Sequence, residues 1–456
     1  MTFHTYNFLI FFLPAAAFLY WIANRLDRTE EKRILRAYLA LLSVGFTVSA
    51  GWICTLTILT GIAVNYCLGK KAYKKLVLLL GIALNAAVLV CFKILSGGVY
   101  APLGLSFYTF SQLAYLIDRY RGERELPFLN YALSILFFAK LAEGPIVNPH
   151  RFVQNNLNRS GFSAEARYCQ MNDGFLRLTM GLVKKVFLAD LIASLANTGF
   201  AMSRLTIWEA WITSIAYSMQ LYFDFSGYCD IAIGLGKLFG IHLPENFNSP
   251  YQAVNIRDFW KRWHMTLTGF LTRYIYIPLG GNRRGRVRTC VNIMAVFLVS
   301  GLWHGFGWTF LIWGTLHGLA MVLDELTKGI SSKLPKPIGI ALTFVFVNVC
   351  WIFFRADSLG QAQVVLRGLI DFSSANVLIS PEFTRRIAKH FPMTDTLAVA
   401  ILFVGCIVAF LMPNATRIMR SRKRSVPVLI LTAVVFMLCV YMISTVDVTS
   451  SLYFNF

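Results

Sequence analysis

The sequence alternates between long apolar runs and short polar loops that are rich in lysine and arginine. The apolar runs cover residues 7–23, 37–68, 76–95, 102–117, 128–141, 175–200, 208–239, 289–323, 338–354, 397–412 and 426–443. A helix needs about 20 residues to cross a hydrocarbon core of about 30 Å, so most of these runs can cross or can enter and turn back. We therefore predict an all-α polytopic membrane protein with about ten to twelve transmembrane or re-entrant helices.

The basic loops predict how these helices are oriented, because cytoplasmic loops carry the excess of lysine and arginine. Basic clusters flank the run at residues 37–68, which is therefore expected to be a hairpin that turns near Gly51. The same rule places the arginine-rich loop 283–288 in the cytoplasm and both chain termini on the opposite, extracytoplasmic side. The first run is predicted to be a retained span, because it lacks the basic start and the small-residue cleavage site of a signal peptide.

Composition supports this class of protein. Apolar residues make up 57% of the chain and charged residues only 14%, whereas soluble domains are about 45–50% apolar. The net charge of +21 does not indicate nucleic acid binding, because the basic residues lie in short loops, where topology and anionic membrane lipids account for most of it. The nine cysteines have no metal-ligand spacing, and we predict no metal and no permanently bound cofactor. With no long linker, residues 1–456 are expected to form one membrane domain.

Candidate chemistry is densest in residues 222–318, where His304 is the most unusual residue. It lies in a stretch of 35 residues, 289–323, that contains no Asp, Glu, Lys or Arg. An ionisable side chain at such a depth is a functional hypothesis by default, although a core histidine bonded to the backbone is the alternative. A helix from Arg288 would place His304 about 24 Å above the cytoplasmic edge, at 1.5 Å per residue. The glycines around His304 predict a helix break there.

Three other polar residues in apolar runs, His317, Asp224 and Asp230, also have structural interpretations. His317 would point away from His304 on one continuous helix, so we expect it to be a structural histidine bonded to a backbone carbonyl. Asp224 and Asp230 lie in an apolar helix, where carboxylates face a cavity or pair with a cation. Their six-residue spacing puts them on different faces, and pairing with loop arginines is as plausible as a functional role.

Residues 256–274 have the pattern of an amphipathic helix at the cytoplasmic interface. Asn255, followed by Asp258 three residues later, predicts a capping box at the start of this helix. His264 falls at the border of the apolar arc, so it either faces a cavity or contacts headgroups. Lys261 and Arg262 lie on the polar side, where they would contact lipid phosphates or the phosphates of a nucleotide cofactor.

The loop that follows, residues 277–288, combines glycines with cations. Asn282, Arg283 and Arg284 adjoin glycines that allow close approach of the backbone to a ligand, although the spacing matches no known phosphate-loop motif. A cationic loop near a buried base suits a long, polyanionic acyl donor such as acyl-CoA. Its nucleotide would stay at the loop while its thioester reaches His304, where a neutral imidazole takes a proton from an attacking hydroxyl.

At these residues the chain resembles the membrane-bound O-acyltransferase (MBOAT) family. The similarity is to the bacterial branch that contains alginate O-acetyltransferase, peptidoglycan and cellulose acetylation proteins and the teichoic acid D-alanylation protein. The matching motifs lie at residues 102–110, 143–146, 222–230, 246–251, 258–264, 276–283, 301–305 and 453–456. Several such motifs in the same order are highly specific, and together they span nearly the whole chain.

The resemblance implies a fold, a site and a reaction. It implies helices around a central channel, with His304 as the essential histidine and His264 as a second functional position. It also implies a bacterial cell (inner) membrane protein that moves an acyl group from a cytoplasmic donor to an extracytoplasmic acceptor, commonly through a periplasmic or extracellular acetyltransferase partner. Two departures argue against carrying over alginate itself. Residues 270–274 lack an Arg-Asp pair of the alginate-type pattern, and residues 138–141 read Phe-Ala-Lys-Leu instead of Phe-Pro-Gln-Leu.

We therefore expect an enzyme that uses acetyl-CoA to O-acetylate a cell-surface polysaccharide, with catalytic residues His304 and His264. The expected acyl-CoA contacts are Lys261, Arg262, Asn282, Arg283 and Arg284. D-alanyl transfer from a carrier protein to teichoic acid is the alternative reaction. A proton-coupled transporter or flippase is the alternative of another class, although no inverted repeat is apparent in the sequence.

Overall fold

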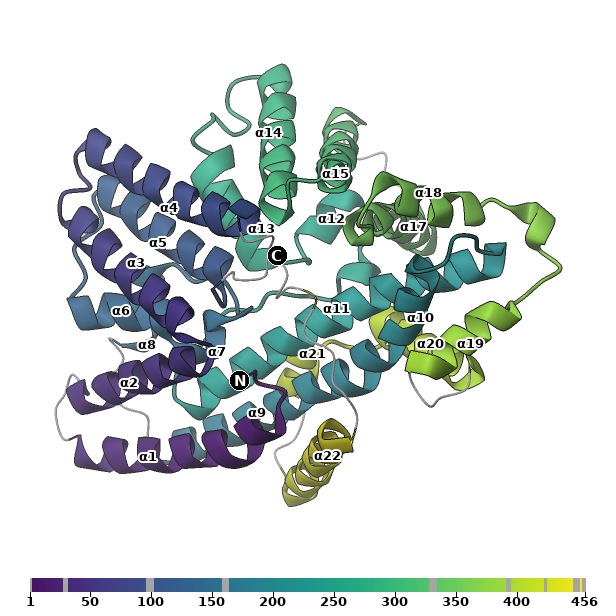
Figure 1. The fold of residues 1–456 in the computed structure, drawn as a ribbon. Coiled ribbons are helices and arrows are strands. Elements are labelled where there is room, and N and C mark those ends of the chain that lie inside the picture. Colours follow the sequence, from purple (N-terminus) through teal and green to yellow (C-terminus); the bar gives the residue numbers. More distant parts are fainter. Residues whose placement is uncertain are drawn as a thin grey trace. The chain divides into compact units, whose positions relative to one another are not determined.

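The computed structural model describes residues 2–27, 32–95, 102–157, 164–327, 334–390, 395–421, 425–445 and 452. Throughout this part of the chain every regular element is a helix, which confirms the predicted all-α class (Figure 1). The C-terminal motif at residues 453–456 lies outside the described residues.

The chain divides into two compact units, each made of segments that are distant in the sequence. Unit 1 comprises Met1–Val183, Gly227–Glu245 and Ser421–Phe456, and unit 2 comprises Lys184–Ser226 and Asn246–Arg420. Helix α11 (Ile207–Leu238) begins in unit 2 and ends in unit 1. The expected single membrane domain over residues 1–456 stays a prediction.

Unit 1 is built from helical hairpins of the N-terminal half and α22. Its elements are η1 (Phe8–Phe12), α1 (Leu13–Leu26), α2 (Arg33–Ser49), α3 (Trp52–Lys70), α4 (Lys75–Leu95), α5 (Leu105–Tyr120), α6 (Phe128–Leu136), α7 (Phe138–Leu141), α8 (Pro149–Asn156), α9 (Ala164–Val183) and α22 (Val426–Thr445). Gly51, at φ +120°, separates α2 from α3, so the predicted hairpin turn at Gly51 is confirmed. Asn65, Asn85 and Gln112 join α3, α4 and α5 through buried side-chain hydrogen bonds.

Unit 2 contains the motif-dense part of the chain. Its elements are η2 (Lys184–Ala189), α10 (Asp190–Phe200), the first part of α11, η3 (Pro250–Gln252), α12 (Ile256–Trp260), α13 (Met265–Leu271), η4 (Thr272–Tyr276), α14 (Arg286–His304), α15 (Trp308–Thr327), α17 (Lys336–Arg355), α18 (Leu359–Gly368), η5 (Phe372–Ser374), α19 (Pro381–His390), α20 (Asp395–Leu411) and α21 (Ala415–Ser421). The Asn255 side chain accepts a hydrogen bond from Asp258 N at 2.8 Å, and the Asp258 carboxylate accepts one from Val254 N. The cap by Asn255 is therefore confirmed, whereas the return bond of the predicted capping box is made to the N–H one residue earlier.

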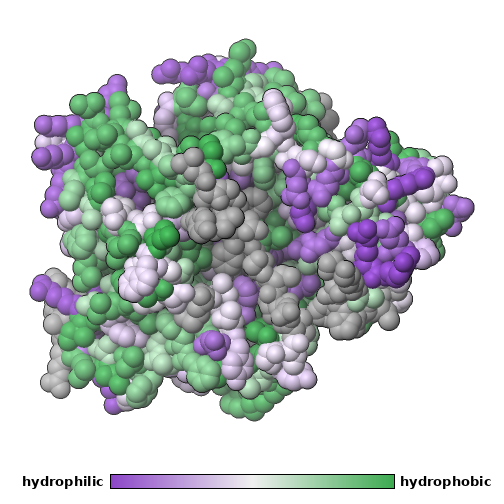
Figure 2. Space-filling model, viewed as in Figure 1, coloured by the Kyte–Doolittle hydropathy of each residue, from purple (hydrophilic) through white to green (hydrophobic). Residues whose placement is uncertain are grey.

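The protein is a multi-pass membrane protein. Six described helices are long and apolar enough to cross a membrane, or seven if the bent pair α20 and α21 forms one broken span. Hydrophobic side chains cover the outer faces of α3 and α4, where Trp52, Leu56 and Leu76 are exposed (Figure 2). The finer expectation of about ten to twelve transmembrane or re-entrant helices around a channel stays a prediction, because the predicted runs 128–141 and 175–200 are each divided among shorter helices.

The hairpin of α14 and α15 positions the most unusual histidine. The two helices lie side by side, with their backbones close together at two glycines (Figure 1). A Cβ on Gly301 would lie 2.6 Å from the Phe310 carbonyl oxygen, and one on Gly314 would lie 2.6 Å from that of Phe297. Only glycine permits this approach, so these two positions fix the register of the hairpin.

Candidate active site

His304 is the last residue of α14, directly before the chain leaves the helix. Gly305 is fully extended and α15 begins at Trp308, so the predicted break around His304 is confirmed. Because α14 is continuous from Arg286, His304 lies about 24 Å along the helix from Arg288, as expected at 1.5 Å per residue. The side chain is buried, and its role in catalysis stays a prediction.

Aromatic rings enclose the His304 imidazole. The ring centroids of Trp303, Phe354 and Trp313 lie at 4.4, 4.9 and 5.2 Å from it. These rings come from α14, α17 and α15, so three helices form the surroundings of His304.

His317 lies on the facing helix of the hairpin, and our expectation for it was wrong in two respects. The break after His304 removes the continuous helix on which the two side chains would point apart, and Trp313 contacts both rings, at 5.2 and 5.1 Å. Neither ring nitrogen of His317 has a hydrogen-bond partner among the described residues, so the expected bond to a backbone carbonyl is absent there. His317 instead lies among aromatic rings, with the centroid of Trp260 at 5.0 Å.

His264 lies at an interruption between two helices. The predicted continuous amphipathic helix over residues 256–274 is wrong, because α12 ends at Trp260 and α13 begins at Met265. His264 caps α13 in the left-handed conformation, at φ +43°, which a non-glycine residue adopts only when its surroundings hold it there. A helical wheel therefore could not place this side chain.

Asn246 holds the His264 ring in a defined tautomer. Asn246 Oδ1 accepts hydrogen bonds from the backbone N–H and the hydroxyl of Thr266, at 3.1 and 3.0 Å, and lies 3.1 Å from His264 Nδ1. Because this oxygen accepts, Nδ1 carries the proton and Nε2 is the basic nitrogen. Burial, including edge-on contact with Phe225 at 4.8 Å, lowers the pKa of His264 to about 3.

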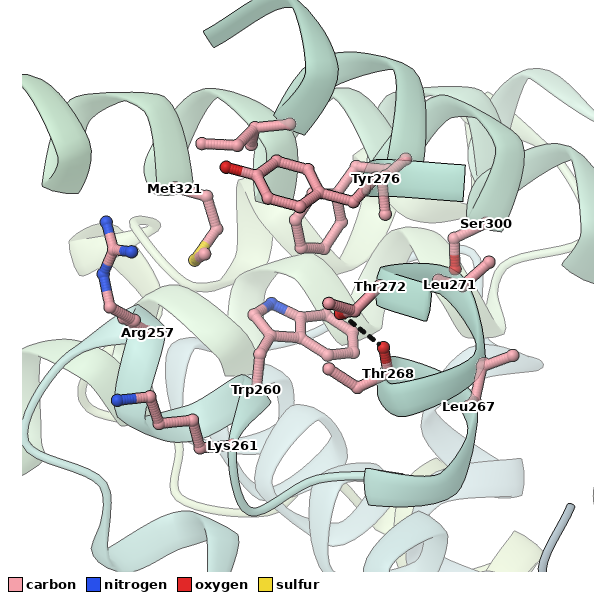
Figure 3. A pocket seen from close by; sticks show the side chains of 13 residues that line it. Arg257, Trp260, Lys261, Leu267, Thr268, Leu271, Thr272, Tyr276, Ser300 and Met321 are labelled. Atoms are coloured by element: carbon pink, nitrogen blue, oxygen red, sulfur yellow. Dashed lines mark hydrogen bonds between the residues drawn. The ribbon is translucent and has the colours of Figure 1, made fainter. Parts of the chain in front are cut away.

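A pocket of about 340 Å³ lies between α12, α13, η4 and α14 (Figure 3). Its walls are aromatic and aliphatic, with Trp260, Phe297 and Tyr276 as the largest side chains. From α14 it is lined by Ile293, Val296, Phe297 and Ser300, whose spacing follows one helix face. His304, four residues beyond Ser300, is the next position on that face, so the pocket wall leads along α14 toward His304.

The pocket mouth combines cations with carboxylates. Arg257 and Lys261 extend side by side at the end of the pocket away from Ser300 (Figure 3). The Arg257 guanidinium contacts Asp324 at 2.7 Å and Glu325 at 2.8 Å. Lys261 is exposed and has no ion-pair partner among the described residues, so it is the mouth cation best able to meet a ligand phosphate.

The other predicted donor contacts lie away from the pocket lining. Arg262 forms an ion pair with Asp258 at 2.8 Å. Asn282, Arg283 and Arg284 are exposed in the turn before α14. This turn contains Gly280, Gly281 and Gly285 in left-handed conformations, and Asn292 anchors it by donating to Gly281 O at 2.9 Å. The structure thus brings Lys261 to the pocket, and the roles of all these residues in donor binding stay predictions.

The two aspartates of α11 are in buried ion pairs. In unit 2, Lys185 Nζ lies 2.8 Å from both Asp190 and Asp224. In unit 1, Arg177 contacts Asp230 and Glu245, each at 2.6 Å. The cationic partner of Asp224 lies in η2 and that of Asp230 lies in α9. Both partners are therefore in helices and are not the loop arginines that the sequence had suggested. No group of three or more residues able to hold a metal occurs in the described part of the chain.

Sequence reasoning missed three residues that shape the site. Asn246 was covered only by the motif at residues 246–251, and Ser300 and Trp313 only by the uncharged run 289–323. For Ser300 a signal was present, since it precedes His304 by one helical turn. The contacts of Asn246 and Trp313 join distant segments, which periodicity does not reveal.

Comparison with known proteins places this geometry in context. Residues 41–358 match the membrane-bound O-acyltransferase family. The chain is 34% identical to the peptidoglycan O-acetyltransferase of Helicobacter pylori, over 93% of this chain and 91% of that protein. It is 33% identical to a probable alginate O-acetylase of Pseudomonas aeruginosa, over 82% and 76%. It is 30% identical to the teichoic acid D-alanyltransferase of Bacillus subtilis, over 55% and 67%.

Proposed function

Because this chain belongs to the membrane-bound O-acyltransferase family, we propose that it transfers acetyl groups from cytoplasmic acetyl-CoA to a polysaccharide outside the cell membrane. It is an O-acyltransferase; the acetyl donor, the acceptor and the residue roles are the proposed part. The observation that carries the proposal is the pocket that starts at Lys261 and follows one face of α14 toward His304.

From its mouth to its inner end, the pocket suits the nucleotide, the extended arm and the thioester of acetyl-CoA in turn. Lys261 offers a cation at the mouth for the phosphates of the nucleotide. The apolar walls suit the extended arm of the donor, whose length would carry the thioester inward. His304 then lies beyond the inner end of the pocket, on the same helix face as Ser300.

In the proposed reaction His304 acts as the general base. Its neutral imidazole takes the proton of the acceptor hydroxyl as the hydroxyl oxygen attacks the thioester carbonyl. The tetrahedral intermediate collapses with cleavage of the carbon–sulfur bond, and the imidazolium returns the proton to the leaving thiolate. His264, neutral and with Nε2 as its basic nitrogen, assists by accepting a hydrogen bond in the same chamber.

The relatives favour an acetylated glycan as the product. The peptidoglycan O-acetyltransferase aligns over 93% of this chain, and the teichoic acid D-alanyltransferase over 55%. Acetyl transfer is therefore preferred to D-alanyl transfer. The acceptor is a cell-surface polysaccharide, acetylated directly or through an acetyltransferase partner on the outer side. About ten to twelve crossing or re-entrant helices around a central channel, with both termini outside, complete the proposal.

The test uses purified protein in liposomes with labelled acetyl-CoA on the side of the 283–288 loop. We expect labelled acetyl groups on a glycan acceptor supplied on the opposite side, or on a partner acetyltransferase added there. His304→Ala should lower this transfer by about 10²- to 10⁴-fold, the usual contribution of a general base. Donor turnover that is unaffected by His304→Ala would exclude the proposed role. Proton flux without acyl transfer would favour a transporter.

A further inference from the structure

Ser300 is the last pocket residue before His304 on α14. The residue is buried, and its side chain lines the pocket at the end opposite Arg257 and Lys261 (Figure 3). Ser300 and His304 are four positions apart in the continuous helix α14, which puts them on one face with a rise of about 6 Å between them.

The Ser300 hydroxyl differs in its hydrogen bonding from the hydroxyls of the two threonines that also line the pocket. Thr272 Oγ1 donates to Thr268 O at 2.7 Å, and Thr268 Oγ1 donates to Trp263 O at 3.4 Å. Ser300 Oγ forms no hydrogen bond within the described residues, although a helical serine can usually donate to the carbonyl four residues earlier. Because this hydroxyl opens onto the pocket and is not bonded within the described residues, it can donate to a ligand there.

We propose that the Ser300 hydroxyl donates a hydrogen bond to the carbonyl oxygen of the donor's acyl group. This deepens the proposed function and rests on it, because it requires a thioester in this pocket. The hydroxyl has the one donor that a carbonyl oxygen can accept, and the apolar walls around it strengthen the bond. It holds the acyl carbon within reach of a nucleophile that His304 activates.

The chemical consequence falls on the attack step. When the acceptor oxygen adds to the carbonyl carbon, the carbonyl π electrons move to oxygen, and this oxygen gains negative charge. A hydrogen bond already aimed at that oxygen strengthens as the charge develops, so it stabilises the transition state more than the bound substrate. No covalent bond to Ser300 forms, and the proton of its hydroxyl stays on Ser300.

The test is steady-state kinetics of purified Ser300→Ala, Ser300→Thr and Ser300→Cys with acetyl-CoA and a glycan acceptor. Ser300→Ala should lower kcat and kcat/KM together by about 10²-fold with little change in KM, as expected when a transition-state donor is lost. Ser300→Thr keeps a hydroxyl and should retain most of the activity. Thr57→Val, at a hydroxyl of α3 that donates to Ile53 O and does not line the pocket, is the control and should stay within about twofold.

The outcomes separate this proposal from the proposed function. No transfer from acetyl-CoA by the unsubstituted protein would overturn the acetyl-CoA reaction itself. Normal transfer by the unsubstituted protein with Ser300→Ala within twofold of it would overturn the role of Ser300 alone. If Ser300→Ala does not fold, Ser300→Cys decides, because its thiol preserves the size of the side chain but donates weakly. Its kcat should then fall while KM is retained.

Discussion

Two buried polar regions of unit 2 hold their polar groups in opposite ways. In one, Lys185 from η2 bridges Asp190 and Asp224, so each charge has a countercharge at 2.8 Å. In the other, His304 and His317 lie among aromatic rings on α14, α15 and α17. The ion pairs of the first region have a structural role, because a proton or ligand could bind there only by breaking an ion pair. In the proposed reaction His304, in the second region, takes up and returns a proton.

This contrast explains why charge alone is a poor guide to function in this molecule. The aspartates of α11 are charged residues in an apolar run and therefore also candidates for function, yet both are in ion pairs. His304 carries the proposed chemistry, and the ring contacts around it come from Trp303, Trp313 and Phe354. The difference can be tested by damaging each region separately.

The largest effect on stability is expected from Lys185→Met, which leaves two buried carboxylates without their cation. Removing one partner of a buried ion pair costs about 3–5 kcal/mol, so the protein should melt at a markedly lower temperature. Thermal unfolding in detergent measures this. Lys184→Met, at the neighbouring lysine whose amine lies 3.4 Å from the Ser226 hydroxyl, is the control. Equal melting temperatures for the two variants would contradict the structural role of the cluster.

A smaller effect is expected from Gly314→Ala, which acts on the aromatic region. The added Cβ would meet Phe297 O at 2.6 Å, so α14 and α15 must separate and Trp313 must shift against His304. Overpacking of this kind costs about 1–3 kcal/mol. We expect reduced acetyl transfer in addition to the lower melting temperature. At Gly307 a Cβ would lie 3.6 Å from Thr309 Oγ1, an ordinary contact, and Gly307→Ala should leave both readouts unchanged.

Acid sensitivity should arise from His264. Burial lowers its folded pKa from 6.5 to about 3, so its contribution to stability is fully present above pH 6.5 and is lost as the pH falls toward 3. By pH 5 the unfolded chain binds the proton and the folded chain does not, which costs about 2 kcal/mol. His264→Gln should lose less stability than the unsubstituted protein between pH 7.5 and 5. His242→Gln, at an exposed histidine, should behave like the unsubstituted protein.

The smallest effect is expected from Lys261→Gln at the pocket mouth. An exposed cation contributes up to about 1 kcal/mol, so KM for acetyl-CoA should rise about fivefold with kcat unchanged. Arg284→Gln removes an exposed cation of the glycine loop that does not line the pocket. A larger rise in KM for Arg284→Gln than for Lys261→Gln would mean that the nucleotide lies at the loop, away from the mouth of the pocket.

Most of the helices and turns could be predicted from the sequence, because the patterns that determine them are local. Apolar runs predicted helices, Gly51 and Gly305 lie where turns were expected, and the cap at Asn255 formed as predicted. Each of these depends on a few neighbouring residues or on the period of a helix. The division into two units was not anticipated, because it depends on contacts between segments far apart in the chain.

The site was less predictable because its geometry depends on exceptions to periodicity. A helical wheel put His264 at the border between two faces of a long helix, whereas the helix stops before it and Asn246 holds the ring. The distance between His304 and His317 along the sequence suggested opposite faces, whereas a hairpin brings both rings against Trp313. Hydrogen bonds between distant segments and helix breaks override the pattern at these residues.

The most direct measurement compares acetyl transfer per folded molecule in His304→Ala and Lys185→Met. Transfer is measured in liposomes below the melting temperature of both variants, and the folded fraction is taken from the unfolding curve. Our account predicts that His304→Ala keeps its melting temperature and loses transfer, and that Lys185→Met loses melting temperature and keeps transfer per folded molecule. The reverse assignment, with transfer lost only in Lys185→Met, would contradict it.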